Sequence, residues 1–216
     1  MDLQAYKELA RRLDALPNGF PPTPDGAELR LLAKLFTPEE AGLAAKLRLT
    51  PETVTEYAER TGGDAGILRR KLRTMAKKGL ITVGKTDRGL EYSIMPFAVG
   101  IWEMQASTID EELARLFEDY FQQAFSIGLM VRPQFHRVLP VGNSVAMDLE
   151  VAPYESAAAM VSRAKAWGVV DCLCRKQQAL IGKGCDHPLE VCMSFSDKPG
   201  AFDGSPFVRA LTLDEA

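Results

Sequence analysis

The chain lacks a long apolar run, and it lacks an apolar export segment at its start. Among its 216 residues no stretch approaches the roughly 18 consecutive apolar residues that a transmembrane helix needs. The opening residues, MDLQAYKE, are charged and helical in spacing, without the basic-then-apolar order of a secretory signal. Both absences predict a protein that does not enter membranes and that stays in the cytoplasm.

Cysteine is absent from the first 171 residues, and all four cysteines lie between Cys172 and Cys192. A disulfide framework spreads its cysteines along a chain to join distant segments, and it forms in oxidising compartments. The clustering therefore excludes a disulfide scaffold and indicates a local site.

A strong excess of charge of either sign is also lacking, as are the motifs of common enzymes. The formal net charge is −3, which gives no overall sign of nucleic-acid binding, so the distribution of charge along the chain must decide. No P-loop, dinucleotide-binding fingerprint or nucleophile elbow occurs. We therefore assign no catalytic residues, and a role other than catalysis is favoured.

The hydrophobic pattern predicts an α+β protein with two compact domains. A composition of 46% hydrophobic and 25% charged residues is that of ordinary folded proteins. Residues 1–25 are expected to form an N-terminal helical arm and a proline-rich linker, residues 26–104 a helical domain that ends in a hairpin, and residues 105–216 a small α+β domain that carries the cysteines. The second domain is expected to contain paired strands within 135–151 and a helix at 154–167.

The first domain combines helices with a β-hairpin. Helical spacing predicts helices at 28–36, at 38–47, directly after Thr50 and at 64–78, with a capping box at the start of the second. Two strand-like runs, 80–83 and 90–94, follow and are joined by a turn that a glycine brackets at each end. This order predicts a winged helix-turn-helix fold, and residues 50–94 resemble the winged-helix domains of bacterial and archaeal regulators.

Positive charge concentrates on the last of these helices and on the hairpin. Between Asp64 and Glu91 eight basic residues stand against three acidic ones, a local balance of +5. Such a helix would present its basic face to the major groove of DNA, and the hairpin would present its basic turn to phosphates. The residues expected to contact DNA are Arg69, Arg70, Arg73, Lys77, Lys85 and Arg88. The alternatives are a solvated helix face and a winged helix that binds protein.

The cysteines follow the spacing C-x-C-x10-C-x6-C. Four thiolates can close a tetrahedral site around zinc or hold the corners of a 4Fe–4S cluster, and this spacing matches the usual pattern of neither. Spacing alone therefore leaves the metal open, with thiols that bind no metal as a third alternative. The candidate ligands are Cys172, Cys174, Cys185 and Cys192.

Three neighbouring residues are expected to support the cysteine site. Either metal complex would carry negative charge, which Arg175 and Lys183 are placed to offset. His187 precedes a proline, and its imidazole is expected to hydrogen-bond a cluster sulfur or the backbone rather than to bind the metal.

The segment 171–193, with CxCR near its start and CDHPLEVC near its end, resembles a family of prokaryotic 4Fe–4S proteins of ferredoxin type that have a winged-helix front half. The resemblance covers most of the chain, and it implies that the four cysteines ligate a 4Fe–4S cluster. Members of that family generally continue into a C-terminal ferredoxin domain, whereas this chain ends at Ala216. Residues 212–215 have the pattern of a capping box, so we expect a truncation at the start of a further helix.

Two classes of function follow from these features. In the first, a redox-responsive metal site biases a winged helix on DNA, which makes the protein a DNA-binding regulator. In the second, the cluster exchanges electrons with a redox partner protein, and the winged helix is a docking or dimerisation platform. A structural zinc protein is a further alternative. The apolar face of an expected helix at 108–128 is wide enough to predict a homodimer.

Overall fold

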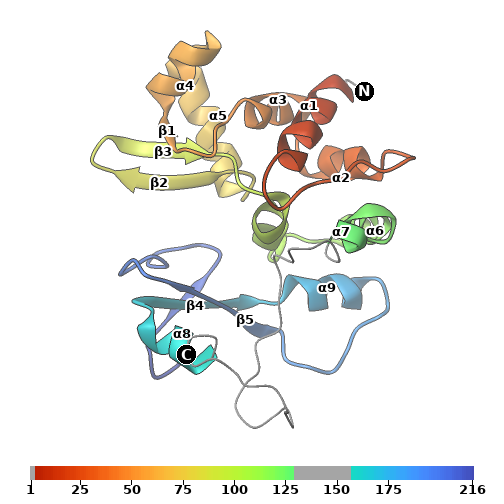
Figure 1. The fold of residues 1–216 in the computed structure, drawn as a ribbon, viewed down its shortest axis with the longest axis vertical. Helices are drawn as coiled ribbons and strands as arrows, with labels where there is room; N and C mark the ends of the chain where they lie inside the picture. The colour runs from red at the N-terminus through yellow and green to blue at the C-terminus, as the bar shows by residue number, and fades with distance from the viewer. Residues whose placement is uncertain (1–2, 129–156) are drawn as a thin grey trace. The chain divides into compact units, whose positions relative to one another are not determined.

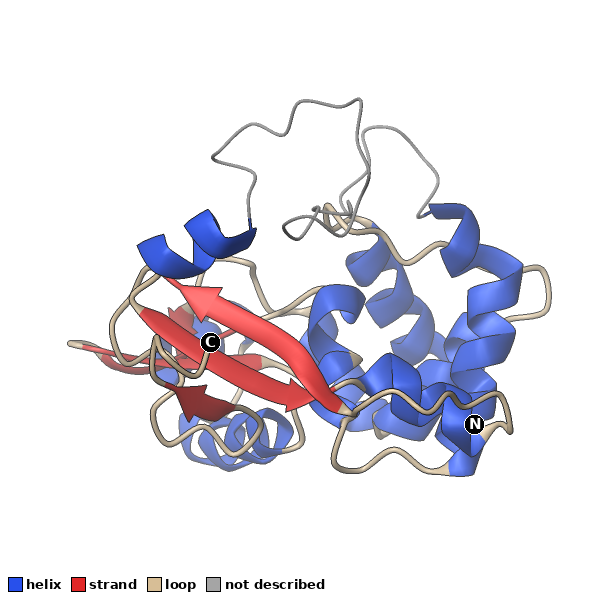
Figure 2. Cartoon of the chain, turned by 90° about the horizontal axis from the view of Figure 1, so that it is seen from below, coloured by secondary structure: helices blue, strands red, loops and turns tan. Residues whose placement is uncertain are grey.

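The computed structural model describes residues 3–128 and 157–216, and the chain divides into two compact units. Unit 1 is Met1–Arg132 and unit 2 is Pro133–Ala216. Each unit combines helices with a small antiparallel sheet, so the expected mixture of helix and strand is confirmed. Helices and strands both contribute to the described structure (Figure 2). In the described part of the chain, no helix is both long and apolar enough to cross a membrane.

Unit 1 begins with three packed helices rather than with a separate arm. They are α1 (Leu3–Asp14), α2 (Ala27–Leu35) and α3 (Pro38–Ala45), and α1 packs against the other two (Figure 1). Leu9 and Leu13 on α1 are at most 1% exposed, and Phe20 in the following linker is also buried. The Tyr6 hydroxyl donates a hydrogen bond to the Phe36 carbonyl at 2.9 Å. Residues 3–25 therefore form part of the core, because the apolar stripe of α1 is covered by its neighbours.

Helix starts in unit 1 follow the capping pattern. Thr37 and Glu40 exchange side-chain and backbone hydrogen bonds, which confirms the expected capping box. Thr53 and Glu56 form a second capping box, and Asp64 caps the next helix. These residues set the first turns of α3, α4 (Val54–Thr61) and α5 (Ala65–Lys77).

A three-stranded antiparallel sheet follows α5. It consists of β1 (Glu52–Thr53), β2 (Thr82–Thr86) and β3 (Gly89–Ser93), in the order β1-β3-β2. The expected hairpin is present, but its turn contains only Asp87 and Arg88, and Gly89 takes a φ of 110° that favours glycine. Strand β1 was not expected, since two residues are too short to give a period-two pattern.

Aromatic side chains fill the rest of the core of unit 1. They come from the segment η1 (Phe97–Ile101), the turn η2 (Glu103–Gln105) and the helical stretch α6 (Glu111–Tyr120), η3 (Phe121–Phe125) and α7 (Ser126–Gly128). The rings of Trp102 and Phe117 stack with their centroids 3.8 Å apart, and Phe20 lies 4.7 Å from Tyr120. Because α6 covers this aromatic cluster, it belongs to unit 1, and the division between units falls after residue 132 rather than at residue 105.

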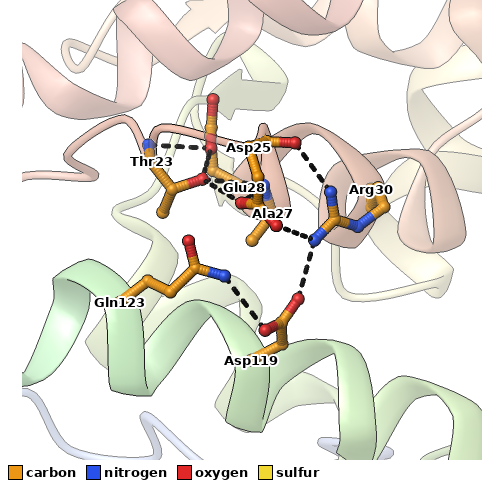
Figure 3. A network of polar contacts seen from close by, with 7 residues as sticks. All are labelled: Thr23, Asp25, Ala27, Glu28, Arg30, Asp119 and Gln123. Carbon is orange, nitrogen blue, oxygen red and sulfur yellow. Dashed lines mark hydrogen bonds and ion pairs between the residues drawn. The ribbon is translucent and has the colours of Figure 1, made fainter.

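A network of polar contacts joins the linker and α2 to α6 (Figure 3). The Arg30 guanidinium bonds the Asp25 carboxylate at 2.9 Å and the Asp119 carboxylate at 2.7 Å. Thr23 donates its hydroxyl and its backbone N–H to the buried carboxylate of Glu28. Arg30 holds the pKa of Asp25 below its usual value, and Asp25 and Asp119 together raise the pKa of Arg30.

Replacing Arg30 by methionine is expected to lower the urea midpoint of unfolding at neutral pH, and to lower it less in acid. The folded-state pKa of Asp25 is depressed, so its stabilising contribution is present above the unfolded value and is lost as pH falls through the folded value. The difference between wild type and variant should therefore shrink as pH falls below 3.8. Exposure of both partners keeps the effect small. Arg70→Met, at a site without a carboxylate partner, is the control, and a pH-independent difference for Arg30→Met would contradict the argument.

Unit 2 is built on a second three-stranded antiparallel sheet. Its order is β5-β4-β6, and the strands are β4 (Ala166–Asp171), β5 (Glu190–Ser196) and β6 (Arg209–Leu211). Helix α8 (Ala157–Arg163) precedes β4 and helix α9 (Leu173–Leu180) follows it. The expected helix at 154–167 therefore ends early, because Trp167 lies in β4, where its indole N–H donates to the Val161 carbonyl at 2.8 Å. The strands expected within 135–151 lie outside the described residues.

Candidate functional site

Helix α5 buries one face and exposes four cationic side chains on the rest of its surface. Leu68, Leu72 and Met75 form the buried stripe that fixes its rotation. The exposed cations are Arg69, Arg70, Arg73 and Lys77. Each of these residues was expected to contact DNA, and the rotation of α5 leaves all four accessible.

Carboxylates on neighbouring elements neutralise three other cations of this region. Lys71 pairs with Glu39 of α3, and Lys78 pairs with Glu40 at 2.6 Å. Arg88 pairs with Glu56 of α4 at 2.6 Å. The local balance of +5 counted along the chain therefore overstates the charge of the folded surface.

Five cations of the α5 and hairpin region remain without such partners. Within residues 3–128 and 157–216, no salt bridge or hydrogen bond involves the side chain of Arg69, Arg70, Arg73, Lys77 or Lys85. Lys85 lies on β2, all five residues of which are exposed. These five residues, which we call the cationic face, can bind an external anion without first breaking an internal ion pair.

Arg88 differs from the other expected DNA contacts because the fold already engages it. Its guanidinium bridges the Glu56 carboxylate of α4 and the Glu91 carboxylate of β3, the latter at 2.5 Å. Hydrogen bonds from Thr53, together with the positive charge of Arg88, lower the pKa of Glu56. Glu91 is only 6% exposed, so the ion pair also compensates a buried charge. Arg88 therefore fixes the hairpin turn against α4, a role that sequence reasoning missed.

The four cysteines are distributed over the junction of β4 with α9, helix α9 itself, the following loop and β5. Cys172 lies between β4 and α9, where it is the N-cap of the helix. Cys174 lies in the first turn of α9, and Cys192 lies on β5 opposite Val170. The Leu189 carbonyl accepts a hydrogen bond from the Cys172 backbone N–H at 2.7 Å, which ties the start of β5 to the end of β4. None of the four forms a disulfide, and only Cys172 is half-buried.

Cys185 lies on the exposed loop that leaves α9. Gly182, with a φ of 79°, ends the helix, and the Lys183 N–H donates to the Gln178 carbonyl at 2.8 Å. Gly184 passes close to Ala179, where an added Cβ would lie 3.2 Å from the alanine Cα. The chain thus turns back along the C-terminal half of α9 before it reaches Cys185.

Residues expected to support the cysteines are placed around the same loop. The Arg175 guanidinium donates to the Pro188 carbonyl, so it fastens the end of the loop to the first half of α9. His187 and Lys183 are both exposed. Lys176 pairs with Asp171 at 2.6 Å.

The described residues contain no group of three or more histidine, cysteine, aspartate or glutamate side chains placed to hold a metal ion. The donor chemistry suits zinc or an iron–sulfur cluster, because four thiols lie on neighbouring segments without disulfides. The arrangement does not gather them into a site. Backbone pairing joins the segments of Cys172 and Cys192, whereas Cys185 occupies a surface loop.

The helix expected to form a homodimer directs most of its apolar side chains into unit 1. Leu113, Phe117, Tyr120 and Phe125 are at most 7% exposed. Leu116 and Phe121 are half-buried, and Ile127 is 64% exposed. Little apolar surface therefore remains on this stretch for a partner.

Comparison of the chain with family models, with curated proteins and with solved structures finds no match. The geometry described above is therefore the basis for any functional conclusion.

Proposed function

We propose that unit 1 is a winged helix-turn-helix that binds duplex DNA, with α5 as the recognition helix and the β2–β3 hairpin as the wing. The observation that carries the proposal is the cationic face, five exposed cations without carboxylate partners in the described structure. Solvated helix faces usually intersperse charges of both signs, whereas α5 exposes arginine and lysine with no acidic residue after its cap.

The order of elements supports the same proposal. Helices α3, α4 and α5 precede the hairpin, and β1 joins its sheet beside β3. Helix α5 has 13 residues, long enough to lie in a major groove, and its buried stripe leaves the opposite face accessible. Lys85 on β2 extends the positive charge beyond the helix toward flanking phosphates.

Electrophoretic mobility of genomic fragments at low salt tests this function. Binding should weaken steeply with salt, with a log–log slope of about −0.9 for each neutralised phosphate. Wild-type protein that retards no genomic DNA at low salt, with or without metal, would exclude a DNA-binding role.

We further propose that the four cysteines of unit 2 bind a metal centre, with a 4Fe–4S cluster as the leading candidate and zinc as the alternative. Support comes from the donor set and from the hydrogen bond that joins the Cys172 and Leu189 segments. A cluster would supply a one-electron redox centre sensitive to oxidants. With such a cluster in unit 2 and DNA bound by unit 1, the protein would be a redox-responsive DNA-binding regulator.

Electron transfer is the second candidate function. The exposure of Cys174, Cys185 and Cys192 favours it, because a centre at the surface lies within reach of a redox partner protein. In this alternative the winged helix is a docking platform, and DNA affinity would not differ between metal-loaded and metal-free protein. Comparison of the two forms in the same mobility assay separates the two roles.

Self-association through residues 108–128 remains a prediction, which light scattering tests. A dimer would have twice the 23.7 kDa mass of the chain, and Leu116→Ser with Ile127→Ser should return it to the monomer mass. These two positions are chosen because neither is among the buried side chains of the core. A mass of 23.7 kDa, unchanged by metal or DNA, would contradict the dimer and leave the helix as internal core.

A further inference from the structure

A groove of about 260 Å³ lies where α4, α5 and β3 meet, at one edge of the cationic face. Its walls include Thr53 of β1, the start of α4 at 54–55, and Arg69 and Arg73 from α5. Arg88 from the hairpin turn and Tyr92 of β3 complete them. We propose that this groove binds a phosphate group, and that in the DNA complex the group belongs to the DNA backbone. The assignment of this phosphate to the DNA backbone rests on the proposed function. The binding of a phosphate group in the groove does not.

The charges around the groove favour an anion. Arg88 has two carboxylate partners, Glu56 and Glu91, which hold its guanidinium at the wall. Arg69 and Arg73 have no such partner among the described residues. Three arginines and two glutamates leave the site one positive charge in excess. A phosphate, with several acceptor oxygens, can accept hydrogen bonds from two guanidinium groups at once.

Arg69 and Arg73 place two like charges together at one wall of the groove. They are four residues apart on α5, so their side chains lie on the same face, where two like charges repel and destabilise the helix. Their neighbours Lys71 and Lys78, by contrast, have carboxylate partners on α3. An anion between the two guanidinium groups would turn the repulsion into a binding site.

Tyr92 gives a second, independent observation. The side chain is 1% exposed and lines the groove. Its hydroxyl is buried without a hydrogen-bond partner among the described residues. Buried hydroxyl groups nearly always have partners, because leaving one unpaired is costly. A phosphate oxygen in the groove would accept the hydrogen bond that this hydroxyl lacks.

The test compares two pairs of substitutions on the same helix. Arg69→Gln with Arg73→Gln removes the two groove cations, and Arg70→Gln with Lys77→Gln removes the same charge outside the groove. Inorganic phosphate, added against chloride at equal ionic strength, should raise the Tm of wild type and of the control pair, but not that of the groove pair. Tyr92→Phe should weaken phosphate affinity several-fold without lowering the Tm of the phosphate-free protein, because it removes only the unpaired hydroxyl.

Binding of duplex DNA to the same variants is the second measurement of the test. Inorganic phosphate should compete with DNA for wild type, and the groove pair should weaken DNA binding about equally for all sequences, with a salt slope reduced by about one for each lost contact. A phosphate response without DNA retardation would leave the groove as a site for a free phosphate and exclude the DNA function. DNA binding with no phosphate response, and with equal losses in both pairs, would overturn the groove and keep the DNA function. If neither ligand binds, both proposals fail.

Discussion

Replacing Arg70, Arg73 and Lys77 together by glutamate is expected to abolish DNA retardation, with a loss of affinity on the order of a hundredfold or more at low salt. The three residues are exposed on α5 and have no ion-pair partners in the described structure, so the change acts on free surface charge rather than on the fold. Three cations become three anions, which removes phosphate contacts and adds repulsion at the same positions. Electrophoretic mobility at several salt concentrations measures both the loss and its salt dependence.

The matched control reverses three exposed cations elsewhere in unit 1. Lys7 lies on α1, and Lys46 and Arg48 follow α3. The side chains of these three residues have no partners among the described residues, and their replacement by glutamate gives the same change in net charge. If binding follows net charge alone, both triple variants lose equal affinity, which would contradict a defined interface on α5. Circular dichroism should give each variant the helix content of wild type, because none of the six side chains is buried.

Capping residues and hydrophobic spacing predicted most of unit 1 because both signals are local. Thr37 and Glu40 are three residues apart, and Leu68, Leu72 and Met75 follow the helical period. Which elements pack against the apolar face of an amphipathic helix is not a local property of its sequence. Residues 3–14 show the stripe that needs cover, but nothing in their spacing indicates that α2 and α3 supply it.

Ion pairs at the candidate interface also depend on residues that are distant in the sequence, so local spacing does not predict them. Lys71, Lys78 and Arg88 look available when the chain is counted from Asp64 to Glu91. Their carboxylate partners lie 32 to 38 residues earlier in the sequence, on α3 and α4. Only the packing of those helices against α5 and the hairpin separates the engaged cations from the cationic face. The groove beside Tyr92 also depends on packing, since its walls come from β1, α4, α5 and the hairpin.

In unit 2 the sequence groups the cysteines more tightly than the fold does. In the sequence Cys185 lies between Cys174 and Cys192. In the structure α9 ends before Gly182, and the following loop runs back along the helix. A β-bulge where β4 and β5 pair, between Val170 and Asp171, further shifts the register beside Cys192. Spacing along the chain reports neither feature. Metal binding would therefore have to draw residues 181–189 toward β4, and it should make this loop less accessible.

Cys172→Ser and Cys192→Ser are each expected to remove most of the cluster from anaerobically prepared protein. Wild type should be brown, with a broad charge-transfer absorption and nearly equal amounts of iron and sulfide, because four thiolates complete the protein coordination of a 4Fe–4S cluster. A serine hydroxyl is a far weaker ligand for iron than a thiolate. Iron and sulfide analysis, together with absorption spectra, measures occupancy. Unit 1 should stay folded in both variants, because its buried core comes from residues 6–125.

Ser194→Ala is the matched control, since it lies two residues from Cys192 on the same face of β5 and removes no thiol. It should keep the wild-type iron content. Limited proteolysis provides a readout independent of colour: the 181–189 loop should be cut readily in metal-free protein and in Cys185→Ser, and slowly in loaded wild type. Colourless wild type that holds stoichiometric zinc after anaerobic iron reconstitution would replace the cluster by a zinc site. Protein that binds neither metal, with the loop cut equally under all conditions, would refute a metal centre, because the proposal requires the cysteines to come together from the separated positions of the described structure.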